Sequence, residues 1–166
     1  MTIWIKSTAL SYMYEVEYVD NVILSFKEKR RDKQLRYERK VLKDLKPKLL
    51  KERYHSFMAN QQSLGITSSH VLEEGCYDVA IEAFLLGANF SKFQHYGESV
   101  DTIKARCFHE EKHLIDTLFN FILYWGKISD FDMYNESLYY RCEQYVDNWW
   151  HDGFFSGAKR YKLRLH

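Results

Sequence analysis

The sequence predicts an all-α protein, built as a single-domain antiparallel helical bundle with a long basic helix near its N-terminus. One proline and seven glycines in 166 residues leave too few turn residues for a turn-dense β architecture. Apolar residues recur three and four positions apart over long stretches, which indicates amphipathic helices. Short polar segments join these stretches, so helices adjacent in sequence are expected to pack antiparallel.

The first residues have a different pattern. Tyr14, Val16 and Tyr18 alternate with polar positions, which is typical of a short strand. A variable or disordered leader is the alternative. We therefore expect a leader over residues 1–20 and a single helical domain over 21–166.

A basic helix is predicted over residues 27–46, where Lys, Arg, Leu, Glu and Gln are all good helix formers. Pro47 then supplies a stop or a kink, because proline lacks a backbone N–H and clashes with the preceding turn. The first two turns, over 27–34, contain no apolar side chain. They have nothing to bury, so we expect them to project into water or onto a partner.

Four further helices are expected, over residues 48–62, 69–95, 100–125 and from about 133 onward. A Ser or Thr of the loop 63–69, and Ser99, are suitable N-cap residues, because a hydroxyl oxygen accepts a bond from the first helical turn. In the last helix we expect Gly153 and Gly157 to loosen the structure. The Trp149–Trp150 pair is expected to place one ring in the core and the other at an edge or interface.

The formal charge of +1 hides a strong segregation of charge. Residues 27–53 carry thirteen Lys and Arg against five Asp and Glu, a net +8. Residues 54–158 carry six against fifteen, a net −9. The basic stretch therefore needs a polyanion, or the acidic part of the same or a neighbouring chain, to balance it.

Nucleic acid or an acidic protein surface is the partner that this stretch favours, because guanidinium groups suit phosphate and dense positive charge releases counterions. The candidate binding residues are Lys29, Arg30, Arg31, Lys33, Arg36, Arg39, Lys40 and Lys43. A solvated charged helix is the alternative. Pairs four residues apart, Asp32–Arg36 and Lys40–Asp44, are expected but are too few to neutralise the run.

One motif could bind zinc. His109, Glu110 and His113 fit the pattern H-E-x-x-H, in which two histidines on one helix face hold Zn²⁺ and the glutamate acts as general base. Glu136 could supply a third ligand. The intervening Glu111 and Lys112 are charged, however, whereas such a helix usually packs uncharged residues there. An exposed, charged helix turn is the alternative interpretation.

A second metal hypothesis uses two E-x-x-H pairs. Carboxylate-bridged di-metal bundles combine two such pairs with one glutamate from each of two other helices, all pointing inward. The candidate ligands for Zn or Fe/Mn are Glu52, His55, Glu82, Glu110, His113 and Glu143, with Glu136 as a substitute for the last. Surface glutamates and hydrogen-bonded histidines are the alternative, and our main expectation is that no cofactor is bound.

The cysteines and the N-terminus indicate a cytoplasmic protein. Three cysteines with no C-x-x-C spacing do not form a disulfide framework, which favours a reducing compartment. The N-terminus lacks the pattern of a signal peptide, and no run of 18 apolar residues would span a membrane.

Three stretches resemble a known family. They are FKEKRRDKQLRYERKVLKDL at 26–45, the pair YDVAIEAFLLGANFSKF and EEKHLIDTLFNFILYWG within 77–126, and KRYKLRLH at 159–166. Together they are similar to a small family of uncharacterised proteins, a domain of unknown function, from spore-forming Gram-positive bacteria. The resemblance covers about residues 22–166. It implies a bacterial cytosolic protein and brings no activity, substrate or catalytic residue.

These observations favour a non-enzymatic adaptor or regulator whose basic helix binds a polyanion, with no catalytic residue assigned. A metal-dependent helical-bundle enzyme is the alternative. Self-assembly is a third possibility, with the basic helix of one subunit on the acidic body of another.

Overall fold

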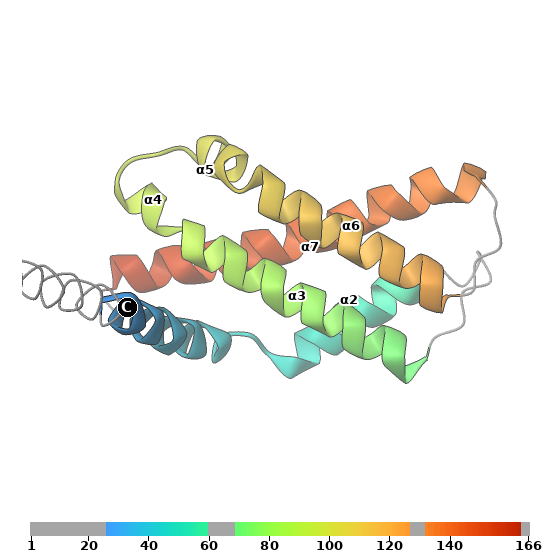
Figure 1. Ribbon diagram of the computed structural model, residues 1–166, viewed down its shortest axis with the longest axis horizontal. Coiled ribbons are helices and arrows are strands. Elements are labelled where there is room, and N and C mark those ends of the chain that lie inside the picture. The colour runs from blue at the N-terminus through green and yellow to red at the C-terminus, as the bar shows by residue number, and fades with distance from the viewer. Residues whose placement is uncertain (1–25, 60–68, 127–131, 164–166) are drawn as a thin grey trace, which may run out of the picture. The chain divides into compact units, whose positions relative to one another are not determined.

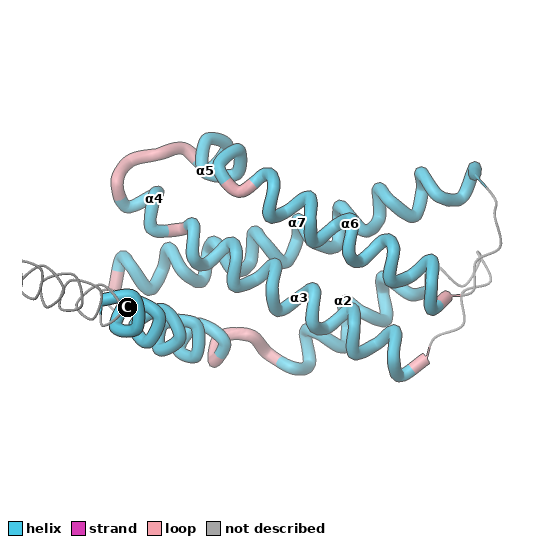
Figure 2. The backbone as a smooth tube through the Cα atoms, viewed as in Figure 1, coloured by secondary structure: helices cyan, strands magenta, loops and turns pink. Residues whose placement is uncertain are grey.

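A computed structural model describes residues 26–59, 69–126 and 132–163. Over these ranges the chain is helical and contains no strand, which confirms the predicted all-α class (Figure 2). The strand expected near Tyr14 lies outside the described residues. The chain divides into two compact units, residues 1–39 and 40–166. The expected boundary at residue 20 also lies outside the described part, so it stays a prediction.

The basic helix runs over residues 26–42, so it begins one residue before and ends four residues before the predicted range of 27–46. A turn follows it, in which the amide of Asp44 donates to the carbonyl of Val41 at 2.9 Å. Pro47 does not kink the basic helix but begins the next one, α2 (Pro47–Ala59). The first helical position suits proline, because the N–H that proline lacks would have no partner there.

Both predicted N-caps are confirmed, and the cap from the loop 63–69 is its last residue, Ser69. Ser69 Oγ accepts from the amide of Leu72 at 3.2 Å at the start of α3 (His70–Phe90). Ser99 Oγ accepts from the amide of Thr102 at 3.3 Å at the start of α5 (Val100–Arg106). These side-chain oxygens satisfy amide groups that the first helical turn leaves without a backbone acceptor.

Two of the predicted helices are each divided in two. The expected helix 69–95 is interrupted at Ser91, between α3 and the single turn α4 (Lys92–His95). The expected helix 100–125 is interrupted at Cys107, between α5 and α6 (Phe108–Trp125). At the second interruption the amide of Cys107 bonds the carbonyl of Lys104, three residues back, so the chain leaves α-helical geometry there.

The last helix, α7 (Asp132–Lys162), is continuous through Gly153 and Gly157, so the expected loosening is wrong. A side chain at Gly153 would collide with the backbone carbonyl of Phe84 on α3. One at Gly157 would collide with Ser91 and the backbone of Ala88. The glycines therefore allow the backbones of α3 and α7 to approach closely.

Helices that follow one another run in opposite directions: α2 against α3, α3 against α6, and α6 against α7 (Figure 1). The closest pair, α3 and α7, runs in the same direction. The hydroxyl of Tyr145 on α7 donates to the backbone carbonyl of Cys76 on α3 at 3.3 Å. Further along both helices, Gly153 of α7 lies against Phe84 of α3. The tightest packing therefore joins two parallel helices, which the connection lengths did not predict.

Both tryptophans of α7 are fully buried, so the ring that was expected at an edge or interface lies in the core as well. Trp149 lies under the guanidinium of Arg53 from α2, 4.4 Å from the ring centre. Trp150 stacks on Phe154 and belongs to a cluster with Ile103 from α5. The reason is that Trp149 contacts a side chain of α2 and Trp150 contacts side chains of α5, so both adjacent positions of α7 face protein.

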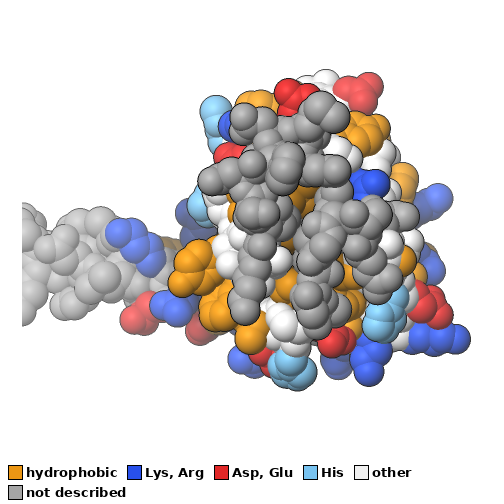
Figure 3. All heavy atoms as spheres, turned by 90° about the vertical axis from the view of Figure 1, so that its right-hand side faces the viewer, with side chains coloured by type: hydrophobic (Ala, Val, Ile, Leu, Met, Phe, Trp, Pro, Cys, Tyr) orange, Lys and Arg blue, Asp and Glu red, His pale blue; other side chains and the backbone are white. Residues whose placement is uncertain are grey.

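All three cysteines are free and buried. In the described ranges no helix is both long and apolar enough to cross a bilayer. On the face drawn in Figure 3, acidic and basic side chains are interspersed around hydrophobic ones.

Candidate functional site

The basic helix exposes its cations. Residues 26–36 are exposed without exception, and so are Arg39, Lys40 and Lys43. In this described stretch, Arg36 Nε donates to the backbone carbonyl of Asp32 at 3.2 Å instead of to its carboxylate. The expected Lys40–Asp44 pair is likewise replaced, because the carboxylate of Asp44 bonds Arg160. The predicted i,i+4 neutralisation is therefore absent from both positions.

The predicted metal ligands do not come together in the described ranges. All of the predicted metal ligands are exposed. The di-metal candidates are Glu52, His55, Glu82, Glu110, His113 and Glu143, and the zinc hypothesis adds His109 and Glu136. No three His, Cys, Asp or Glu side chains of the described residues are grouped so as to hold an ion. The apolar neighbours Ala83 and Leu114 occupy the inward positions, which turns Glu82 and His113 to solvent.

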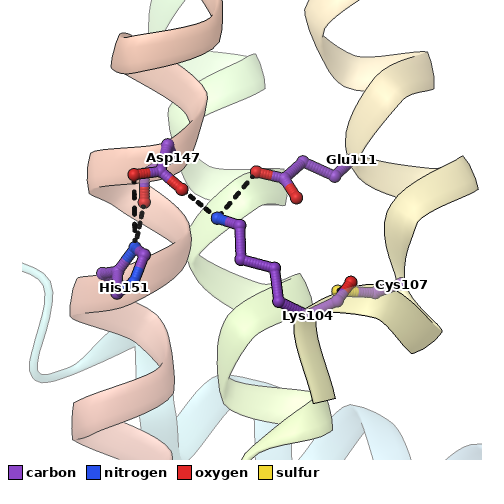
Figure 4. A network of polar contacts seen from close by, with 5 residues as sticks. All are labelled: Lys104, Cys107, Glu111, Asp147 and His151. Carbon is purple, nitrogen blue, oxygen red and sulfur yellow. Dashed lines mark hydrogen bonds and ion pairs between the residues drawn. The ribbon is translucent and has the colours of Figure 1, made fainter. Parts of the chain in front are cut away.

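The structure contains a cluster of ion-paired side chains that the sequence analysis did not single out. Glu111, treated above as a charged position inside the H-E-x-x-H motif, has a side chain only 9% exposed. Its Oε1 lies 3.0 Å from Nζ of Lys104, which also bonds the carboxylate of Asp147. Figure 4 shows Lys104 between Asp147 of α7 and Glu111 of α6, with His151 on the other side of Asp147.

Each member of this group is positioned by a local feature of the chain. The Ser99 cap starts α5, which carries Lys104, and the break at Cys107 starts α6, which carries Glu111 in its first turn. Asp147 comes from the middle of α7. The Lys104 ammonium also lies 4.6 Å from the centre of the Trp150 ring, a cation–π contact. Three helices and a buried ring therefore fix one ammonium.

The surroundings of Lys104 keep it charged. Burial by itself would lower the pKa of the ammonium, but its hydrogen bonds to Asp147 and Glu111 outweigh burial and raise the pKa above the usual range. A lysine acts as a nucleophile or base only in its neutral form. Lys104 is therefore suited to holding the three helices together and not to covalent chemistry.

The neighbouring thiol, that of Cys107, is buried beside Lys104. Cys107 is fully buried, and its Sγ donates to the carbonyl of Lys104 at 3.4 Å. Burial raises the pKa of this thiol, and only the thiolate is a strong nucleophile. The group thus consists of the Lys104 ammonium, the carboxylates of Glu111 and Asp147, and the Cys107 thiol. Its ion pairs join α5, α6 and α7, and a charged surface lies beside it.

That surface is a cleft of about 790 Å³ between α5 and α6 on one side and α7 on the other, which we call the acidic cleft. Its lining comprises Asp101, Lys104, Ala105, Phe108, Glu111, Lys112, Ile115, Tyr139, Tyr140, Glu143, Gln144 and Asp147. This lining contains four carboxylates and two lysines, so its net charge is negative. Phe108 and Tyr140 are more than half exposed, so the cleft offers both negative charge and aromatic surface to a partner.

The sequence did contain a signal for Glu111. It lies four residues after Cys107 and three before Leu114, both buried, so it occupies the apolar stripe of α6. A charged residue within such a stripe indicates a buried ion pair, because an isolated buried charge is strongly unfavourable. The partners Lys104 and Asp147 could not be identified in the same way, because they come from other helices.

Comparisons with known proteins agree with the predicted resemblance. The family described as "Protein of unknown function (DUF2521)" matches residues 20–166. The chain is 31% identical over 145 residues to the "Uncharacterized protein YbaK" of Bacillus subtilis (strain 168), an alignment that covers 86% of this chain and 97% of that protein. No solved structure matches. The resemblance to an uncharacterised family with a Gram-positive member is therefore confirmed.

Proposed function

We propose that this chain, which belongs to the DUF2521 family of proteins of unknown function, is a non-enzymatic adaptor or regulator that binds a polyanion through its basic segment. The basic segment is the helix over residues 27–39. The single observation that carries the proposal is the complete exposure of residues 26–36, a stretch that includes Arg30, Arg31 and Lys33. Seven Lys and Arg against three Asp and Glu leave this segment with a net positive charge, and an exposed net positive charge favours an external anion.

Nucleic acid is the polyanion that we propose first. Seven Lys and Arg residues lie within thirteen positions of the basic segment, and each cation placed on a phosphate releases a counterion. About five such contacts give a slope of roughly −4.5 in a plot of log K against log salt concentration. The binding is expected to be insensitive to sequence, because phosphate contacts carry no base information.

Fluorescence anisotropy with a labelled oligonucleotide tests this proposal. We expect the affinity of the wild type to fall by more than a hundredfold between about 50 and 200 mM salt. The variant R30E/R31E/K33E is expected to lose binding at the lower salt concentration and to keep the wild-type melting temperature, because those side chains are exposed.

A matched control separates a site from general charge. K46E/K51E/K92E makes the same change in net charge at three exposed lysines outside the basic segment. We expect this control to keep most of the affinity. Equal losses in both triple variants, or a wild type that ignores nucleic acid at low salt, would contradict a nucleic-acid site in the basic segment.

The acidic cleft supports a second candidate, in which the polyanion is a protein. The basic segment of one copy would bind the acidic cleft of another, giving a homo-oligomer. Sedimentation velocity at low and high salt tests this, because screening weakens contacts between exposed charges. Glu143→Lys, an exposed substitution in the cleft, should shift a low-salt oligomer to monomer. A wild type that is monomeric at low salt would refute the oligomer.

A further inference from the structure

We infer that the hollow between α4 and the C-terminal part of α7 binds single-stranded nucleic acid by stacking its bases on exposed aromatic rings. Both elements lie at the same end of the bundle (Figure 1), and the hollow has a volume of about 970 Å³. We call it the aromatic pocket, and its aromatic and basic lining residues are His95, Tyr96, Phe155, Lys159, Tyr161 and Lys162. The inference rests on the nucleic-acid binding proposed above and adds a second site, because these residues belong to the unit of residues 40–166.

Two rings of the aromatic pocket are turned to solvent. The side chain of Tyr96 is 76% exposed and that of Phe155 is 59% exposed. An exposed ring forgoes the free energy that its burial would provide, and exposed apolar groups gathered at one place mark an interaction site. A flat ring suits a nucleobase in particular, because every base has a π-face on which the ring can stack.

Local contacts hold these two rings in place. The turn that carries Tyr96 is closed by the amide of Tyr96, which donates to the carbonyl of Phe93 at 3.0 Å, and by Gly97, whose φ of 90° suits glycine. The ring of Phe155 lies edge-to-face on the buried ring of Phe154, with the ring centres 5.9 Å apart. Rings fixed in this way lose less entropy when a base stacks on them.

A third ring comes from the last turn of α7. Tyr161 is partly buried, and its pKa is raised by burial first and by the phenol of Tyr96 second. An effect of one phenol on the other requires that the two lie close together, so the α4 turn and the end of α7 contribute rings to the same surface. The raised pKa also keeps the Tyr161 hydroxyl neutral, so it does not repel a phosphate.

The charge beside the rings suits the phosphates of a strand. Lys159 and Lys162 are exposed, and no carboxylate is among the lining residues in the described part of the chain. Asp44 does attract Lys159, but its carboxylate accepts two hydrogen bonds from Arg160 and one from Ser156. Three cations against this one carboxylate leave a net positive charge, which attracts phosphate.

The order of side chains along α7 favours a strand over a membrane. Phe155, Lys159 and Lys162 are four and three residues apart, so they lie on one face of the helix. A helix that binds a bilayer buries a continuous apolar face in it, whereas here the cations occupy positions that such a face would need. A single strand, by contrast, presents bases and phosphates in alternation, and rings beside cations match both.

The first test compares three ligands in fluorescence anisotropy with the full-length chain. They are a thymidine strand of about twelve nucleotides, an abasic strand of the same length and phosphate count, and a duplex. We expect the thymidine strand to bind at least about fivefold more tightly than the abasic strand, the least that one stacked base contributes. Equal affinities for these two strands would overturn the inference and leave phosphate binding by the basic segment standing.

Variants assign the preference for bases to the aromatic pocket. Y96A/F155A is expected to bind the thymidine and abasic strands equally and to keep the wild-type melting temperature, because both rings are exposed. Y124A/F108A is the matched control, since it removes a tyrosine that is 76% exposed and a phenylalanine that is 56% exposed, both outside the pocket. The control should keep the preference. A preference that survives in Y96A/F155A, or disappears in both variants, would contradict the inference.

NMR of the aromatic side chains separates this site from the basic segment. A thymidine tetranucleotide at millimolar concentration, where weak sites are also detected, should shift the ring signals of Tyr96, Phe155 and Tyr161. The variant R30E/R31E/K33E should keep these shifts, so the pocket can be verified even if the basic segment binds no nucleic acid. No ring shifts in either protein would overturn the inference. Ring shifts with vesicles of phosphatidylglycerol and phosphatidylcholine, and none with the tetranucleotide, would also overturn it and indicate a membrane surface.

Discussion

The guanidinium of Arg160 donates two hydrogen bonds, each 2.8 Å long, to the two carboxylate oxygens of Asp44. Asp44 lies in the turn directly after the basic helix, and Arg160 lies in the last turn of α7. Ser156 adds a third bond to the same carboxylate at 2.7 Å. The turn at residues 43–46 is thus tied to the C-terminal helix by a planar ion pair, which explains why Asp44 does not pair with Lys40.

The Asp44 carboxylate should make stability depend on pH. The hydrogen bond from Arg160 is the largest cause holding the pKa of Asp44 below its usual value of 3.8, against the opposing effect of burial. A lowered pKa in the folded state adds stability above the unfolded pKa and loses it as pH falls through the folded pKa. Asp44→Asn should therefore cost up to about 1 kcal/mol near neutral pH and less in acid, as expected for a partly exposed pair.

Urea unfolding at about pH 7 and pH 3 measures this difference. Asp78→Asn is the control, because Asp78 is an exposed carboxylate and no described residue pairs with it. The interpretation is wrong if Asp44→Asn destabilises equally at both pH values, or if the control behaves in the same way.

Gly153→Ala should separate α3 from α7. The added Cβ would collide with the carbonyl of Phe84, which is backbone and cannot rotate away. Although alanine favours a helix by about 1 kcal/mol over glycine, we expect a net loss of about 2–3 kcal/mol from overpacking. Chemical denaturation measures it.

Gly75→Ala serves as the comparison for this loss. Gly75 is also helical and also crowded, but its close neighbour is the ring of Phe121, a side chain that can shift. We expect Gly75→Ala to be clearly less destabilising than Gly153→Ala. Equal effects would mean that the backbone contact between α3 and α7 is not what limits the size of residue 153.

Removing the Lys104 ammonium should be costly. Lys104→Met leaves the carboxylate of Glu111 buried without a cation, at a cost of about 3 kcal/mol. Lys104→Met/Glu111→Leu should recover at least half of that loss, because an apolar pair does not have to be desolvated as charges. Lys112→Met, which removes an exposed lysine paired with Asp116 at 3.8 Å, should stay within about 0.5 kcal/mol of wild type.

Thermal or urea unfolding of these variants gives the comparison. A double variant that is less stable than Lys104→Met would show that Glu111 stabilises the fold without Lys104. The buried ion pair would then not be the interaction that joins α5 to α6.

The three thiols should be unreactive in the native protein. Burial raises the pKa of Cys76 to about 12 and raises those of Cys107 and Cys142 as well. A thiol reagent such as DTNB should therefore label none of them rapidly in buffer and all three in denaturant. Fast labelling of one cysteine in the native state would indicate local opening of the helix that carries it.

The helical class and much of the core followed from the sequence. Spacing of three and four residues placed Leu138, Cys142 and Val146 on one buried face of α7, and the structure buries all three. The caps at Ser69 and Ser99 were also predictable, because a cap depends on residues within one turn. These features are local, so a single stretch of chain determines them.

The pairing of helices required the tertiary structure. Periodicity shows which side of a helix is apolar but not which helix covers it, so it could not reveal that Trp149 and Trp150 face different neighbours. The same limit explains the error over Gly153: its role depends on the carbonyl of Phe84, which lies on another helix.

The sequence by itself thus determined an all-α chain with an exposed basic helix, because propensity, caps and apolar spacing act within a few residues. Only the tertiary structure decided that Glu111 and Lys104 meet in the interior and that His95 and Phe155 line one pocket. Those side chains come from different helices, and the energy of a buried charge depends on the partner that packing brings to it.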